Sequence, residues 1–176
     1  MTHYHFISPV LKRSTKEIRI LDENNIEVGT IQRYFNSKFS YFFDIFLSNF
    51  IVNIKAHDKT KMIVAKVEEN VKWKDFIKFV RLNWNVTNEL GTFKMIDRTK
   101  IKTHPEYELL INDLSYKINK DLGNKTIKIH NDAAQLVATI QYDKMIPPQR
   151  YTINIINPEV SIHTVACLSY VFILRN

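Results

Sequence analysis

The chain has 176 residues, of which 45% are hydrophobic and 24% are charged, and its formal net charge is +7. These proportions exclude a disordered or fibrous chain and predict a single domain over residues 1–176. One cysteine excludes a disulfide framework, and the N-terminus lacks the apolar run of a signal peptide, so we expect a cytoplasmic protein.

Alternation of apolar and polar residues predicts about twelve antiparallel strands. The first contains His3 and His5. The others are expected at 18–21, 26–33, 50–56, 62–68, 76–84, 90–97, 107–111, 114–120, 126–130, 136–142 and 150–156. Because so little helical pattern separates these segments, they favour an all-β barrel or sandwich.

Three of the expected hairpins share one pattern, in which a strand ends at Asp or Asn and a small residue follows seven positions later. The pairs are Asp22 and Gly29, Asp58 and Ala65, and Asn131 and Ala138. A looser copy joins residues 76–84 to 90–97 through the expected turn NVTNE. Repetition of one hairpin favours a meander or barrel, and the small residues leave room for a close neighbour on the inner face.

Residues 37–50, SKFSYFFDIFLSNF, have helical spacing of their apolar side chains, and Ser37 is a suitable cap. An amphipathic helix of this kind could lie on a membrane. Its polar face has no basic residue, however, so we favour a helix that covers an open end of the barrel.

The segment Val160–Leu174 is apolar on every side when drawn as a helix. It is shorter than the roughly 20 residues of a membrane span, so it is expected to be surrounded by protein. Asn157, Pro158 and Glu159 predict the start of this helix. The sequence therefore predicts an all-β fold with a central helix, in which about twelve strands form a barrel around a buried C-terminal helix.

His163 and Cys167 share one face of that helix, where such a pair could form an activated nucleophile. A buried cysteine more often packs as a small apolar side chain, so we expect no catalytic residue here. No glycine-rich phosphate loop, CxxC or HExxH occurs, and neither a cofactor nor a metal site is predicted.

The positive charge is concentrated between residues 61 and 102, which hold ten basic and five acidic side chains. Within this region, residues 71–84, VKWKDFIKFVRLNW, interleave basic and aromatic side chains. The candidate binding site for an anionic headgroup or other phosphorylated ligand comprises Lys72, Lys74, Lys78, Lys94, Lys100 and Lys102. Two alternatives stay open: an ordinary strand with solvated lysines, or single-stranded nucleic acid stacked on Trp73 or Trp84.

Four segments together resemble the tubby C-terminal-like superfamily, which includes LURP-one-related proteins and phospholipid scramblases. They are DENNIEVGTIQR, NDAAQLVATIQY, RYTINII and VSIHTVACLSYVFIL. The chain is most similar to small bacterial members. The resemblance implies a twelve-stranded barrel around a hydrophobic C-terminal helix.

The resemblance also bears on function. Tubby proteins bind phosphoinositide headgroups, and scramblases are linked to lipid movement, although neither the tubby basic site nor a scramblase calcium loop can be matched here. We therefore expect a non-enzymatic binding or scaffold protein that recognises anionic lipid headgroups, peripherally at the inner membrane. Nucleic-acid binding through the same basic residues, a protein partner, and an enzyme using Cys167 and His163 are the alternatives.

Overall fold

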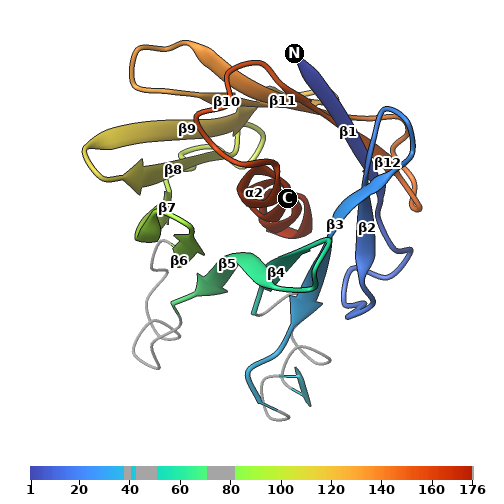
Figure 1. Cartoon of the computed structure of the whole chain (residues 1–176). Coiled ribbons are helices and arrows are strands. Elements are labelled where there is room, and N and C mark those ends of the chain that lie inside the picture. The colour runs from blue at the N-terminus through green and yellow to red at the C-terminus, as the bar shows by residue number, and fades with distance from the viewer. Residues whose placement is uncertain (38–40, 43–50, 71–81, 176) are drawn as a thin grey trace.

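The computed structural model describes residues 1–37, 41–42, 51–70 and 82–175. Twelve antiparallel strands close into a barrel, and one helix, α2 (Ile162–Arg175), lies inside it (Figure 1). The strands are β1 (Thr2–Ile7), β2 (Ile18–Asp22), β3 (Glu27–Tyr34), β4 (Asn53–Asp58), β5 (Ile63–Glu69), β6 (Asn83–Asn88), β7 (Gly91–Asp97), β8 (Glu106–Ile111), β9 (Leu114–Lys120), β10 (Thr126–His130), β11 (Leu136–Tyr142) and β12 (Arg150–Ile155). This architecture confirms the expected fold.

Each strand pairs with its neighbours in sequence, and the pairing of β1 with β12 closes the barrel. In that pairing Phe6 lies opposite Tyr151, and their rings stack with centroids 5.1 Å apart. The first and last strands are therefore joined by packing on the inner face as well as by backbone hydrogen bonds.

The expected position of β6 is wrong. The sequence placed a strand at 76–84 and a turn at NVTNE, whereas β6 spans Asn83–Asn88. Trp84 and Val86 alternate into the core, and the turn comes later, where the Asn88 side chain accepts a 2.9 Å hydrogen bond from the Leu90 amide. Residues 71–81 lie outside the described residues.

The helix expected over 37–50 is described only at Ser37, Tyr41 and Phe42. Tyr41 and Phe42 are helical, and the Tyr41 amide donates to the Ser37 carbonyl at 3.2 Å. The remainder of that prediction lies outside the described residues.

The burial of α2 is confirmed, because ten of its residues are buried, among them Val165, Cys167 and Phe172. Its expected start at Asn157 is wrong. Ser161 caps the helix, since its hydroxyl accepts a 3.3 Å hydrogen bond from the Thr164 amide. Composition alone suited both positions, but only Ser161 directly precedes the first helical residue.

The three related hairpins share one turn. In each, the side-chain oxygen of the first turn residue accepts a hydrogen bond from the amide four positions later, and the strand pairing contains a bulge. The bonds run from Ile26 to Asp22 at 2.8 Å, from Met62 to Asp58 at 3.0 Å, and from Gln135 to Asn131 at 2.9 Å. The repeat seen in the sequence therefore has a structural basis.

The helix lies off-centre in the barrel. Its backbone lies closest to β3, β4 and β5, whose inner faces carry Gly29, Ala56 and Ala65. On other strands the inner face carries large side chains instead, such as Tyr107 and Tyr151. Small residues on one wall let the helix approach closely, which leaves more room on the opposite side.

Candidate functional site

The two ends of the barrel differ in charge. We call "basic end" the end that holds the connections 8–17, 98–105, 121–125 and 143–149. These connections contain eight basic residues, Lys12, Arg13, Lys16, Arg98, Lys100, Lys102, Lys125 and Lys144, and three acidic ones, Glu17, Asp121 and Asp143.

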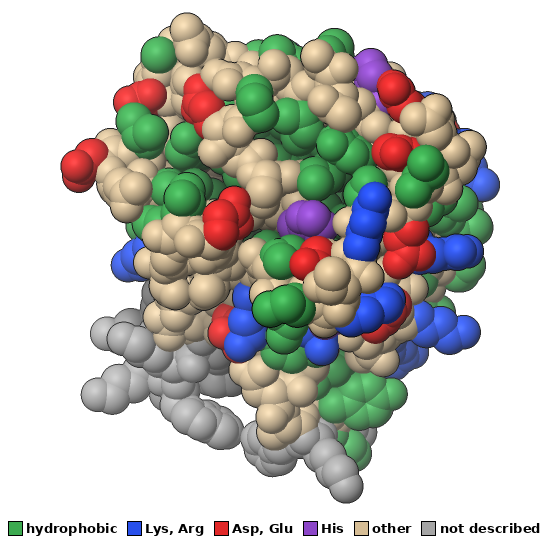
Figure 2. Space-filling model, viewed as in Figure 1, with side chains coloured by type: hydrophobic (Ala, Val, Ile, Leu, Met, Phe, Trp, Pro, Cys, Tyr) green, Lys and Arg blue, Asp and Glu red, His purple; other side chains and the backbone are tan. Residues whose placement is uncertain are grey.

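The opposite end has the reverse balance. Its connections, which include α2's entry segment, contain two basic residues, Lys59 and Lys61, and five acidic ones, Glu23, Glu89, Asp113, Asp132 and Glu159. Among the described residues, the connections therefore carry a net positive charge at one end of the barrel and a net negative charge at the other. On the face seen in Figure 2, by contrast, Lys and Arg are interspersed with Asp and Glu, and hydrophobic side chains lie between them.

Two connections of the basic end, 8–17 and 143–149, are joined by hydrogen bonds into one unit, which we call the projecting unit. The Ser8 amide donates to the Gln149 carbonyl at 2.9 Å, and the Gln149 amide donates to the Ser8 hydroxyl at 3.1 Å. The unit exposes four aliphatic side chains, namely Val10 (63% exposed), Leu11 (60%), Met145 (67%) and Ile146 (75%). Lysine and arginine adjoin these four side chains in the sequence. Contact with an apolar partner would remove the aliphatic surface from water, which is favourable.

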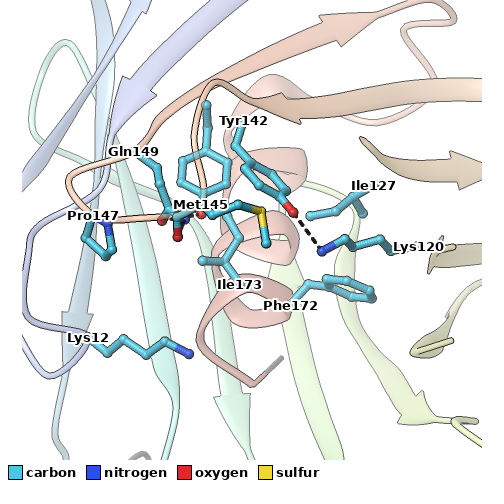
Figure 3. A pocket seen from close by; sticks show the side chains of 10 residues that line it. Lys12, Lys120, Ile127, Tyr142, Met145, Pro147, Gln149, Phe172 and Ile173 are labelled. Carbon is cyan, nitrogen blue, oxygen red and sulfur yellow. Dashed lines mark hydrogen bonds between the residues drawn. The ribbon is translucent and has the colours of Figure 1, made fainter. Parts of the chain in front are cut away.

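A pocket of about 250 Å³ opens beside this unit, between the end of α2 and strands β9 to β12 (Figure 3). Its walls are largely apolar. They comprise Ile127, Met145, Pro147, Tyr151, Phe172 and Ile173, with Lys12, Lys120, Tyr142 and Gln149 as the polar members. The pocket is thus the part of the barrel mouth that the off-centre helix leaves open.

Lys120 faces the inside of the barrel, following Tyr116 and Ile118 on the inner face of β9. Its ammonium donates a 3.0 Å hydrogen bond to the Tyr142 hydroxyl and lies 5.0 Å from the centre of that ring. Figure 3 shows Lys120 and Lys12 approaching the pocket from opposite sides. Two cations therefore border an apolar cavity.

A buried ionic network fixes this end. Arg33 is fully buried and donates to the carbonyls of Lys12 (3.0 Å) and Ile51 (2.7 Å). Glu69 accepts from the Val52 amide at 2.8 Å and pairs with Arg175. Burial raises the pKa of Glu69 above its usual value, although Arg175 opposes this. These contacts tie together the 8–17 connection, β3, residues 51–52 just before β4, β5 and the end of α2.

The predicted site residues are only partly brought together. Lys100 and Lys102 lie exposed in the 98–105 connection, at the basic end. Lys94 is also exposed but lies midway along β7, on the outer wall. Lys72, Lys74 and Lys78 lie outside the described residues. The sequence analysis missed Lys12 and Lys120, although the alternation of Tyr116, Ile118 and Lys120 was a signal for an inward-facing lysine.

A second hollow, of about 470 Å³, lies at the opposite end beside Ser161 and His163. Its cation Lys66 already has a carboxylate partner, because its ammonium lies 2.9 Å from Glu68. The charge in this hollow is therefore balanced within the protein.

The Cys167 and His163 pair lacks the properties of an activated nucleophile. Cys167 is completely buried, and burial raises the pKa of its thiol far above the usual value. The His163 ring nitrogen Nε2 lies 3.2 Å from the Val28 carbonyl oxygen. This supports the expectation that the two residues pack the core.

Within the described ranges, no three His, Cys, Asp or Glu side chains are grouped as metal ligands would be. Nor is any described helix long and apolar enough to cross a membrane.

Comparison with known proteins bears on the family. A search of curated proteins found no match to this chain. Among solved structures, an X-ray structure of a protein from Arabidopsis thaliana shares 10% sequence identity, covers 98% of this chain and 90% of its own, and has a TM-score of 0.47. The family model for the Tubby C-terminal like domain matches residues 4–176, and the chain therefore belongs to that family.

Proposed function

We propose that this protein is a non-enzymatic module that binds anionic membrane surfaces through the basic end. The observation that carries the proposal is the projecting unit of connections 8–17 and 143–149, which exposes four aliphatic side chains and has Lys12, Arg13 and Lys144 next to them in the sequence. Peripheral proteins combine these two features, because the apolar side chains enter the headgroup layer while lysine and arginine neutralise lipid charge. The proposal places the protein in the cytoplasm, peripherally at the inner membrane.

The electrostatic contribution is large enough to matter. Each lysine or arginine near an anionic bilayer contributes about 1 kcal/mol. Among the described residues, the connections of this end contain eight basic and three acidic side chains, which gives a clear excess of attraction, whereas the connections of the opposite end would be repelled. The protein would therefore bind with the barrel axis steeply inclined to the membrane.

Nucleic-acid binding fits the described residues less well. Single strands are held by exposed aromatic rings on which bases stack, and Trp84, one of the rings considered for this role, is completely buried. The exposed side chains of the projecting unit are aliphatic and cannot stack on bases. Nucleic acid is therefore a competitor to include in the test.

The test is co-sedimentation with phosphatidylcholine vesicles, with and without phosphatidylserine, over a salt series. We expect binding only to the anionic vesicles and weakening as salt increases. Replacing Arg13, Lys16 and Lys144 with glutamine should weaken binding about 100-fold at low salt. The matched control, at positions away from the basic end's connections, replaces Lys59, Lys117 and Lys128 with glutamine.

Equal loss in both triple variants would show that net charge alone matters and would contradict a specific docking end. Binding to nucleic acid in preference to anionic vesicles would favour the other class of partner. Absence of binding to anionic vesicles at low salt would overturn the proposal.

A further inference from the structure

The pocket at the basic end contains a cation in an unusual place. Inner-face positions of the barrel are otherwise mostly apolar, yet Lys120 occupies one at the end of β9. It is half-buried, and no carboxylate of the described residues lies within ion-pair distance of its ammonium. Taking a charge partly out of water without a counter-ion is unfavourable, so an anion would be stabilised here.

The geometry leaves donors for such an anion. An ammonium has three N–H donors, and Lys120 uses one on the Tyr142 hydroxyl at 3.0 Å. This bond and the 5.0 Å contact with the Tyr142 ring hold the side chain at the pocket. Lys12 reaches toward the pocket from the other side (Figure 3). The two ammonium groups thus place positive charge at the edge of the pocket, and contacts with Tyr142 hold the Lys120 ammonium in position.

The remaining walls define the rest of the ligand. Ile127, Phe172 and Ile173 come from the barrel and helix, and Met145 and Pro147 come from the projecting unit. These side chains offer no hydrogen bond, so a small inorganic anion would leave them unoccupied. With about 250 Å³, the pocket is smaller than most sites for whole drug-sized ligands, and it suits a headgroup with the beginning of an apolar chain.

We propose that this pocket binds one anionic amphiphile, with its phosphate or carboxylate between Lys12 and Lys120 and its chain along Phe172 and Ile173. This inference rests on the proposed function, since the pocket opens within the basic end and the rest of the chain would follow Met145 into the lipid layer. It adds a site for an individual molecule to a surface that otherwise recognises only charge and apolar character.

Isothermal titration calorimetry with monomeric dodecyl phosphate tests the inference. We expect one molecule bound per protein and about tenfold weaker binding in Lys120→Met, which keeps the chain length and removes the charge. The matched control is Lys117→Met, on the same strand but exposed. Tyr142→Phe should weaken binding as well, because it releases the Lys120 ammonium. Inorganic phosphate tests the anionic group without the chain, and dodecyl maltoside tests the chain with an uncharged headgroup. Both should bind more weakly than dodecyl phosphate.

Vesicle binding of the same variants separates this inference from the proposed function. Lys120→Met should bind anionic vesicles no more than about fivefold more weakly than wild type, the contribution of about 1 kcal/mol expected of one lysine, because the eight basic residues of the connections remain. If vesicles bind but dodecyl phosphate does not, or binds Lys120→Met and wild type equally, the pocket site is overturned and the surface proposal stands. If neither vesicles nor dodecyl phosphate bind, both fail.

Discussion

Three residues that lack the freedom of glycine adopt the left-handed conformation in the related hairpin turns. They are Asn25 (φ 61°), Lys61 (φ 66°) and Ala134 (φ 58°), each three positions after the Asp or Asn that accepts the turn hydrogen bond. Asparagine tolerates this conformation, whereas alanine adopts it only at a cost in free energy, because its Cβ crowds the following carbonyl. The turn at Ala134 is therefore strained, and glycine at this position would avoid the strain.

Replacing Ala134 with glycine should relieve that strain. The conformation costs an L-residue about 1–2 kcal/mol, and glycine gives back part of the gain through its larger unfolded-state entropy. We expect the free energy of unfolding in urea to rise by about 0.5–1 kcal/mol. Ala133→Gly, at a neighbouring exposed position without a positive φ, should instead lower it by about 0.5–1 kcal/mol. Destabilisation by both substitutions would contradict this account.

At the scale of the elements, α2 and the wall that it approaches are matched in size. The sequence signalled both halves of this match, since the tail was apolar on every side and the hairpins carried a small residue at a fixed position. Gly29 shows why a small residue is needed on this wall. A Cβ built there would lie 2.3 Å from the His57 carbonyl oxygen and 2.6 Å from His163 Nε2. Both distances are far below those that real Cβ atoms show.

Gly29→Ala should therefore destabilise the fold by about 1–3 kcal/mol or more, because the backbone of β4 cannot move away as a flexible side chain could. Thermal and urea unfolding measure the change. Gly91→Ala is the comparison, since its Cβ would meet only the Phe93 ring at 3.5 Å, and its cost comes from the positive φ of 136° alone. A Gly29→Ala variant as stable as wild type would show that α2 does not lie against β3 as described.

The sequence predicted the strands and the C-terminal helix correctly but placed some of their first and last residues wrongly. It missed the start of β6 because NVTN contains turn-forming asparagines, whereas burial of Trp84 and Val86 makes this segment a strand. It missed the pocket for another reason. Lys12 and Lys120 lie far apart in the chain and meet only because β1 pairs with β12 and the helix lies off-centre. Periodicity reports the face of one strand but not which strands close a barrel.

At the scale of the whole molecule, partly buried imidazoles link stability to pH. Burial lowers the pKa of His5, His57 and His130 from the usual 6.5, and for His57 nearby Lys55 adds to the effect. The folded protein therefore takes up protons at these sites less readily than the unfolded chain does. Their contribution to stability is present above about pH 6.5 and is lost as the pH falls through the lowered pKa values.

The variant His57→Gln isolates this effect. Wild type should lose more stability between pH 7.5 and pH 5.5, roughly the range in which imidazole titrates, than His57→Gln does. Urea unfolding at each pH measures the difference. Glu69 acts in the opposite direction, because its pKa is raised, but it is present in both proteins and cancels in the comparison. Equal losses in the two proteins would contradict a lowered pKa of His57 in the folded protein.

The charge difference between the ends makes the orientation on a membrane the central claim, and one measurement tests it directly. Single cysteines introduced as Met145→Cys at the basic end and Leu90→Cys at the opposite end would carry an environment-sensitive fluorophore. Both positions are exposed (67% and 58%), whereas the native Cys167 is buried and should react with the label only on unfolding. Wild-type protein treated with the same label is the control for reaction at Cys167. The variants thus report separately on the two ends.

On addition of phosphatidylserine vesicles, the label at Met145 should shift to the blue, and the label at Leu90 should not change. High salt should reverse the shift, since attraction of the surrounding cations holds the aliphatic side chains at the bilayer. A response at Leu90 as strong as that at Met145, or no response at either position, would contradict the account.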